Sequence, residues 1–239
     1  MLSRHDLSRS HRIVPLLAVL LTAGCVGPPS PDSPAPAAPA PSYPVVVDEF
    51  TTILNRTRAA PYAYRVQGDL PAGQNLTASG AYDAKAGRLV AERRLTGGDL
   101  PGGFEALRVD GAKTWVRSSA RLTWTSMPGA ADMSDPMGLS RFAEAIQDVR
   151  SAGPGLYWVY VQPGESSITA ADSFLPIGAP GSVQVFSRLG GAVRVNVTTD
   201  AAGWITAFTM EAQSLGKTHR IVTTLSDHGR PVIVPPVPR

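Results

Sequence analysis

The fold of this chain of 239 residues is best indicated by the stretch Phe104-Glu-Ala-Leu-Arg-Val-Asp-Gly-Ala-Lys-Thr-Trp-Val-Arg117. Its two halves are strand-like, and they flank Asp110 and Gly111. Asp-Gly supplies the positive φ that a tight turn between two strands requires. The stretch therefore predicts a hairpin of two antiparallel strands.

Strand-like segments occupy much of the chain on both sides of this hairpin. They follow one another at a spacing of about 8–12 residues with short turns, which is typical of an antiparallel meander. The segments are 62–67, 76–82 and 88–95 before the hairpin, and 122–125, 156–161, 183–189, 192–199, 204–212 and 217–225 after it. Together with the two halves of the hairpin these are eleven segments, of which we expect about nine or ten to form strands.

Two segments have the spacing of amphipathic helices. The first begins near Val46 and stops before Pro61, because a proline ends a helix. The second begins at Ser134 or Asp135, either of which can cap it, and ends at Gly153-Pro154. Its apolar stripe consists of Leu139, Phe142, Ala143, Ile146 and Val149. Strands and helices together predict an α+β fold.

Residues 1–24 have the pattern of a signal peptide. Residues 1–12 are polar and basic, residues 13–22 are apolar, and small residues follow. The apolar core is too short to remain in a bilayer, because a spanning helix needs about 20 apolar residues. We therefore expect residues 1–24 to be removed after export.

Cys25 follows this segment directly and is the only cysteine of the chain. The segment Leu21-Thr-Ala-Gly-Cys25 resembles the bacterial lipobox, although the leucine stands one position further from the cysteine than is usual. We expect a diacylglycerol on the thiol of Cys25, which would hold the protein at the extracytoplasmic face of the cell membrane. The alternative is an ordinary secretory signal in which Cys25 has no role.

Residues 25–44 predict an extended tether, because they contain eight prolines separated mainly by alanine, serine and glycine. Residues 45–239 have a mixed composition and predict one domain.

Composition excludes several classes of protein. A single cysteine cannot form an intramolecular disulfide or a multi-cysteine zinc site. No apolar run is long enough for a polytopic membrane protein. Most of the net charge of +3 comes from Arg4, Arg9 and Arg12 in the signal peptide, so we expect no nucleic-acid partner.

The sequence offers few candidate catalytic groups, so we expect a protein that is not an enzyme. Only His219 and His228 lie outside the signal peptide, and no Gly-x-Ser-x-Gly motif is present. Asp132 and Asp135 lack the spacing of a calcium loop, and helix capping explains Asp135. We therefore expect no cofactor and no metal.

Three tryptophans on expected strands are candidates for the wall of a ligand cavity: Trp115, Trp158 and Trp204. Ordinary core packing is the simpler explanation for any one of them, and the cavity wall stays open as the alternative.

The order of these parts resembles the LppX/LprG family of actinobacterial cell-envelope lipoproteins, which is related in fold to the LolA and LolB carriers. The residues that carry the resemblance are the tail positions Asp227, Gly229, Pro231, Val232 and Pro235, and the phrase Val109-Asp-Gly-Ala-Lys-Thr-Trp-Val116. The resemblance implies a curled antiparallel sheet, an incomplete barrel, that wraps around helices. It also implies an apolar cavity that holds the acyl chains of a lipid or lipoglycan.

Two functions are compatible with these observations. In the first, the protein carries lipids, and the second helix is a lid whose Leu139, Phe142 and Ile146 face the cavity. In the second, the same fold has a filled interior and acts as a sensor or interaction module for another envelope protein. Large residues filling the inner face would favour the second function, and an apolar void beside the second helix would favour the first.

Overall fold

The computed structural model of the chain describes residues 42–70, 73–98, 102–127, 135–162, 178–182, 193–214 and 216–237. Ser42–Arg239 form a compact unit that is separate from Met1–Pro41. The expected signal peptide, Cys25 and most of the expected tether lie outside the described residues. All of the buried core described below belongs to Ser42–Arg239, so this segment can be produced and studied by itself.

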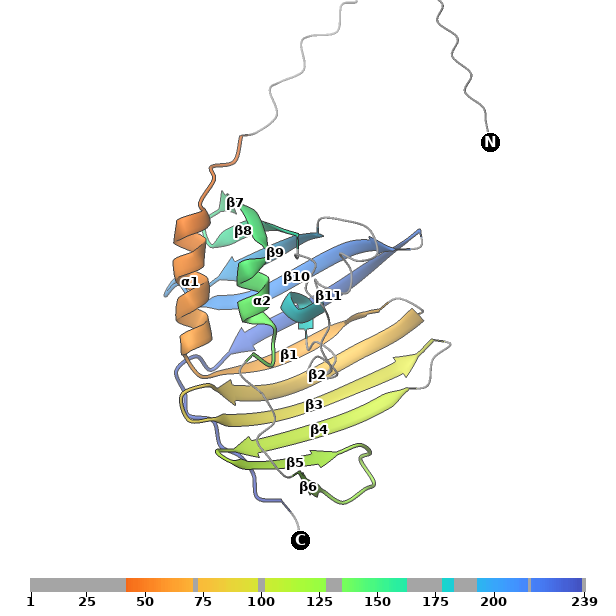
Figure 1. The fold of residues 1–239 in the computed structure, drawn as a ribbon. Coiled ribbons are helices and arrows are strands. Elements are labelled where there is room, and N and C mark those ends of the chain that lie inside the picture. Colours follow the sequence, from red (N-terminus) through yellow and green to blue (C-terminus); the bar gives the residue numbers. More distant parts are fainter. Residues whose placement is uncertain are drawn as a thin grey trace, which may run out of the picture. The chain divides into compact units, whose positions relative to one another are not determined.

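The described part of the chain forms one antiparallel sheet of eleven strands (Figure 1). The strands are β1 (Tyr62–Asp69), β2 (Gln74–Asp83), β3 (Arg88–Gly97), β4 (Gly103–Asp110), β5 (Lys113–Arg117), β6 (Thr125–Met127), β7 (Ile146–Gly153), β8 (Leu156–Val161), β9 (Val193–Thr199), β10 (Ile205–Ser214) and β11 (Lys217–Ser226). Their order is β6-β5-β4-β3-β2-β1-β11-β10-β9-β8-β7, so two meanders join where the first strand pairs with the last. Since β6 and β7 are the edges, the described sheet does not close into a barrel.

Helix α1 (Val47–Ala59) and helix α2 (Leu139–Glu144) lie on the same face of the sheet (Figure 1). A third, short helical segment covers residues 178–182. α1 confirms the first predicted helix, and it buries Phe50, Leu54 and Thr57. Acidic residues lie in its first turn and arginines in its last turn, which matches the helix dipole. The face that α1 and α2 cover is called the inner face below.

The second predicted helix is wrong in its extent. α2 has six residues, and the segment expected to continue it, Ile146–Gly153, is strand β7. The pairing of β7 with β8 shifts register between Ile146 and Asp148, which is a β-bulge. A bulge allows side chains three positions apart to share one face, and this is also a helical spacing. Ile146 and Val149 both pack against the core for this reason.

Most of the predicted strands are confirmed, including the hairpin of β4 and β5 around Asp110 and Gly111. Gly111 has a φ of 60°, as the turn requires. The strand expected at 122–125 begins only at Thr125, and the strand expected at 183–189 lies outside the described residues. The sheet has eleven strands rather than nine or ten.

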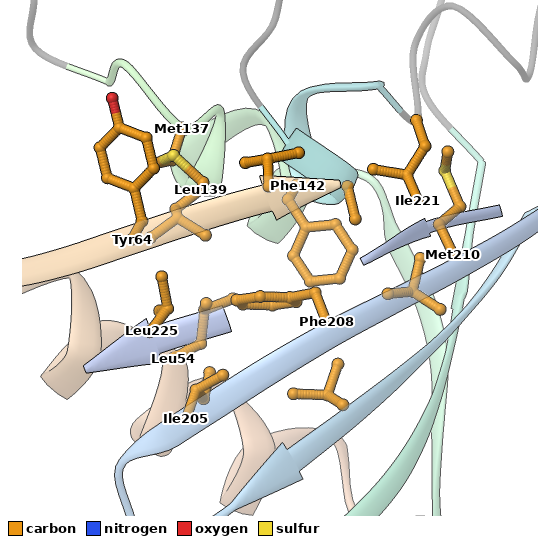
Figure 2. Packing of buried hydrophobic residues seen from close by; sticks show 14 of the residues in the cluster. Leu54, Tyr64, Met137, Leu139, Phe142, Ile205, Phe208, Met210, Ile221 and Leu225 are labelled. Carbon is orange, nitrogen blue, oxygen red and sulfur yellow. The ribbon is translucent and has the colours of Figure 1, made fainter. Parts of the chain in front are cut away.

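The core lies between the helices and the inner face (Figure 2). The rings of Phe142 on α2 and Phe208 on β10 meet edge to face, with centroids 5.6 Å apart. Phe50 on α1 packs against Tyr157 on β8 at 5.3 Å. The apolar surface continues on the strands of the other meander, where the buried inner-face residues are Leu76, Ala78, Leu89, Ala91, Leu107 and Val109.

The segment before α1 lies along the edge strand β7. Val45 forms a β-bridge with Arg150, the Val46 amide donates to the Val149 carbonyl at 2.9 Å, and the Ser151 amide donates to the Pro44 carbonyl at 3.0 Å. The ring of Tyr43 lies 4.4 Å from that of Trp158 on β8. Residues 43–46 therefore protect an edge that would otherwise expose unpaired backbone groups.

Candidate functional site

A pocket of about 320 Å³ lies between α1, α2 and the neighbouring strands β1 and β2. Its wall combines polar and apolar side chains: Asn55, Arg58, Ala59, Tyr62, Tyr82, Ala84, Asp135, Leu139 and Ser140. We call it the α1–α2 pocket. Its volume is at the lower end of the range of about 300–1,000 Å³ that small-molecule sites usually have.

Arg58 connects the two helices at this pocket. Its guanidinium donates to the Ser140 hydroxyl at 2.9 Å and to the Asn55 side-chain carbonyl at 3.1 Å. Asp135 lies opposite on the wall and accepts hydrogen bonds from the backbone amides of Ser140 and Arg141. The carboxylate thus stabilises the start of α2, although the N-cap position is Gly138 and not Asp135 as the sequence predicted. Burial raises the pKa of Asp135, although these two amides act in the opposite direction.

Two buried tyrosines form the aromatic part of the wall. Tyr62 and Tyr82 are directly paired on β1 and β2, and their rings lie edge to face with centroids 5.8 Å apart. Burial raises the pKa of Tyr62 well above its ordinary value, with a smaller contribution from the negative charge of Asp135. Tyr62 therefore keeps its proton at any physiological pH.

The next inward-facing pair along β1 and β2 is Tyr64 and Gly80. A Cβ atom at Gly80 would lie only 2.5 Å from the Tyr64 hydroxyl oxygen, so the phenol ends directly over this glycine. Tyr64 is only 2% exposed, and among the described residues its hydroxyl has no hydrogen-bond partner. Burial raises the pKa of Tyr64 far above its ordinary value, so the hydroxyl remains a donor.

Two charged residues mark the following row of the inner face. Arg93 on β3 is paired across the strands with Glu105 on β4, and their ion pair measures 2.6 Å. Burial lowers the pKa of Arg93, and the charge of Glu105 opposes this effect. The row of Tyr64, by contrast, continues through Ala91 and Leu107, which are apolar.

The three residues expected on the lid take different positions. Leu139 is buried and lines the α1–α2 pocket. Phe142 is also buried, but it fills the interior against Phe208. Ile146 is on β7 instead of α2 and is half-buried at the border of the core.

The three candidate tryptophans are all half-buried and do not line the α1–α2 pocket. Trp115 alternates along β5 with the buried Thr114, so it points away from the inner face. Trp158 contacts Tyr43. Trp204 is stacked between the guanidinium of Arg56, 3.9 Å from its ring centre, and the imidazole of His228, 5.1 Å away.

The sequence did not single out Arg58, Tyr62, Tyr64 or Tyr82 as candidates for a site. Alternating tyrosines at the start of β1 were the available signal, because residues two apart in a strand share a face. The partner strand and the approach of Arg58 to Ser140 depend on tertiary structure, which no local pattern contains.

In the part of the chain that the structure describes, no group of His, Cys, Asp and Glu residues has the arrangement of a metal site. No helix among the described residues has the length and apolar character needed to cross a membrane. No protein-family model matches the chain, and no curated protein is significantly similar to it.

Proposed function

We propose that this protein is a lipoprotein, anchored through Cys25 at the extracytoplasmic face of the cell membrane, that binds the acyl chains of a lipid or lipoglycan without catalysis. The proposal follows the resemblance to the LppX/LprG family and to the LolA-like fold. It takes further support from the α+β architecture, in which one face of an open sheet is covered by helices.

The observation that carries the proposal is the α1–α2 pocket with the surface behind it. The pocket wall includes the charged side chains of Arg58 and Asp135, and its Tyr62 and Tyr82 belong to the same buried cluster as the apolar inner-face residues of β1–β4. Such a combination fits an amphiphilic ligand. Each methylene group removed from water contributes about 0.8 kcal/mol, so an acyl chain binds readily where it meets an apolar surface.

Binding of a whole acyl chain requires α2 to move. Leu139 and Phe142 occupy the space between α2 and the sheet, and Met137 next to them is also fully buried (Figure 2). α2 is short, and it is held at its start by Asp135 and from α1 by Arg58. We expect α2 to act as the lid because it is short, and its opening would withdraw Leu139 and Phe142 from the core.

A second candidate function is supported by the packed interior. Phe50, Leu54, Phe142 and Phe208 are fully or almost fully buried, and they fill the space beneath the two helices. A domain with a filled core would act as a sensor or interaction module for another envelope protein, with no lipid inside.

Native mass spectrometry of residues 42–239 purified from the protein's own host distinguishes the two functions. Copurified or added glycolipid and phospholipid that remain bound in the gas phase would support lipid carriage. A protein that is always empty and takes up no added lipid would contradict it and favour the interaction module.

The anchor is tested separately on the full chain. Wild type is expected in the membrane fraction, and Cys25→Ala in the soluble extracytoplasmic fraction. Metabolic labelling with an alkyne fatty acid should mark only the wild type. An unlabelled wild type that is released with the soluble proteins would exclude lipidation.

A further inference from the structure

Two buried tyrosines, Tyr64 and Tyr157, differ in whether the hydroxyl has a hydrogen-bond partner. Tyr157 is also buried, and its hydroxyl donates to the Glu49 carboxylate at 2.7 Å. The Tyr64 hydroxyl is buried without any hydrogen bond to the described residues. A buried donor without an acceptor is unfavourable, so such a group often marks the place where another molecule supplies the acceptor.

The sheet is shaped to accommodate this hydroxyl. The phenol ends over Gly80, where any larger residue would collide with the hydroxyl oxygen and with the Val90 carbonyl. Gly80 is in the middle of β2, where glycine weakens a strand. Glycine at position 80 therefore leaves space for the Tyr64 hydroxyl at the expense of strand stability.

Tyr64 also stands at a boundary on the inner face. On one side, the Tyr62–Tyr82 pair forms the wall of the α1–α2 pocket with its charged side chains. On the other side, the next pair is Val66 and Ala78, both buried and apolar, and its row ends on β3 and β4 in the Arg93–Glu105 ion pair. A ligand that lay across this boundary would place its polar end in the pocket, its hydrocarbon on the apolar surface, and the group that joins them at Tyr64.

From this arrangement we infer that the ligand is an ester-linked acyl lipid, and that the Tyr64 hydroxyl donates a hydrogen bond to the ester carbonyl. This inference rests on the proposed function, because it requires that the inner face takes up an acyl chain. It adds the chemical class of the ligand and the residue that selects it.

The residues around Tyr64 favour a ligand group without charge as the acceptor of its hydrogen bond. Gly80, Ala91 and Leu107 in its row carry no charge, and Arg93 in the following row is already paired with Glu105. A carboxylate at this position would be desolvated without a cation beside it, which is costly. An ester carbonyl accepts one hydrogen bond and carries no charge, so it fits the site.

The test compares two lipids that differ only in this carbonyl. Dipalmitoyl phosphatidylglycerol contains ester carbonyls, and its dihexadecyl ether analogue contains none. Dissociation constants for residues 42–239 are measured by displacement of an NBD-labelled diacyl lipid. Wild type is expected to bind the diester about tenfold more tightly than the diether. Tyr64→Phe is expected to lose this preference through weaker binding of the diester alone.

Tyr157→Phe is the matched control, because it removes a part-buried tyrosine hydroxyl that already has a partner. It should keep the tenfold preference, and circular dichroism should show that each variant is folded. Equal affinities in wild type, a preference that persists in Tyr64→Phe, or equal weakening of both lipids in that variant would each overturn the inference while leaving lipid binding intact. Wild type that binds neither lipid would overturn the proposed function together with it.

Discussion

Single residues with unusual surroundings decide the local energetics, and Tyr64 and Tyr157 illustrate this. Tyr157→Phe removes a hydrogen bond to a carboxylate and should lower the free energy of unfolding by about 1.5–3 kcal/mol. Tyr64→Phe removes a hydroxyl that has no partner among the described residues, so it should leave this free energy unchanged or raise it. Urea unfolding followed by circular dichroism measures both. Equal losses in the two variants would show that Tyr64 has a partner in the free protein.

His228 gives the stability of the protein a dependence on pH. Burial lowers its pKa below the ordinary value of 6.5, while the hydrogen bond with the Ile205 carbonyl and the charges of Asp200 and Asp227 oppose this shift, and Arg56 adds a smaller lowering effect. Below about pH 6.5 the unfolded chain therefore binds a proton more readily than the folded chain, and stability falls. We expect wild type to lose stability between pH 7.5 and pH 5.5 in thermal unfolding.

His228→Phe tests this expectation, because it keeps an aromatic ring beside Trp204 and removes the titrating group. The variant should lose less stability than wild type over the same pH range, whatever its stability at pH 7.5. An identical decrease in both proteins would assign the pH dependence to other groups.

At the scale of elements, local patterns were sufficient for α1 and for the hairpin of β4 and β5. α1 is a separate amphipathic segment before a proline, and the hairpin contains its own turn signal. The same reasoning failed for Ile146–Gly153, because a bulge imitates a helical spacing and only the pairing with β8 reveals the strand. The α1–α2 pocket depends on contacts such as Arg58 with Ser140, which are 82 residues apart, and no local pattern predicts them.

The start of α2 depends on Gly138. Its φ is 70°, and a Cβ atom there would lie 2.7 Å from the Cα atom of Gly181. Gly138→Ala should therefore lower the free energy of unfolding by about 2–4 kcal/mol, since backbone strain of about 1–2 kcal/mol is added to a backbone collision. Urea unfolding measures the change.

Gly111→Ala, in the turn between β4 and β5, is the matched control for Gly138→Ala. Gly111 also has a positive φ, 60°, but nothing lies within 4 Å of the added Cβ atom. Gly111→Ala should lower the free energy of unfolding by the strain alone, about 1–2 kcal/mol. If both variants lost the same amount, the close approach of Gly138 and Gly181 would have no energetic importance.

At the scale of the whole molecule, residues 43–46 protect the β7 edge of an open sheet. A chain that begins at Val47 lacks this protection and exposes the Val149 carbonyl and the Ser151 amide. Exposed edges pair with other chains, so we expect the truncated protein to self-associate as its concentration rises. Size-exclusion chromatography with light scattering compares it with the chain that begins at Ser42.

Tyr43→Ala in the longer chain is the control, because it removes the ring contact with Trp158 and leaves the backbone pairing in place. This variant should stay monomeric. A truncated chain that is monomeric at the same concentrations would show that β7 is protected in another way.

The pairing of β1 with β11 also has a consequence for the order of events during synthesis. Tyr64 lies opposite Leu225, so the central contact of the sheet joins positions at nearly opposite ends of the domain. Such contacts carry a large loop-closure entropy, and proteins that depend on them fold slowly. A ribosome must therefore finish almost the entire polypeptide before the two halves of the sheet can meet, and until then each half remains accessible to chaperones.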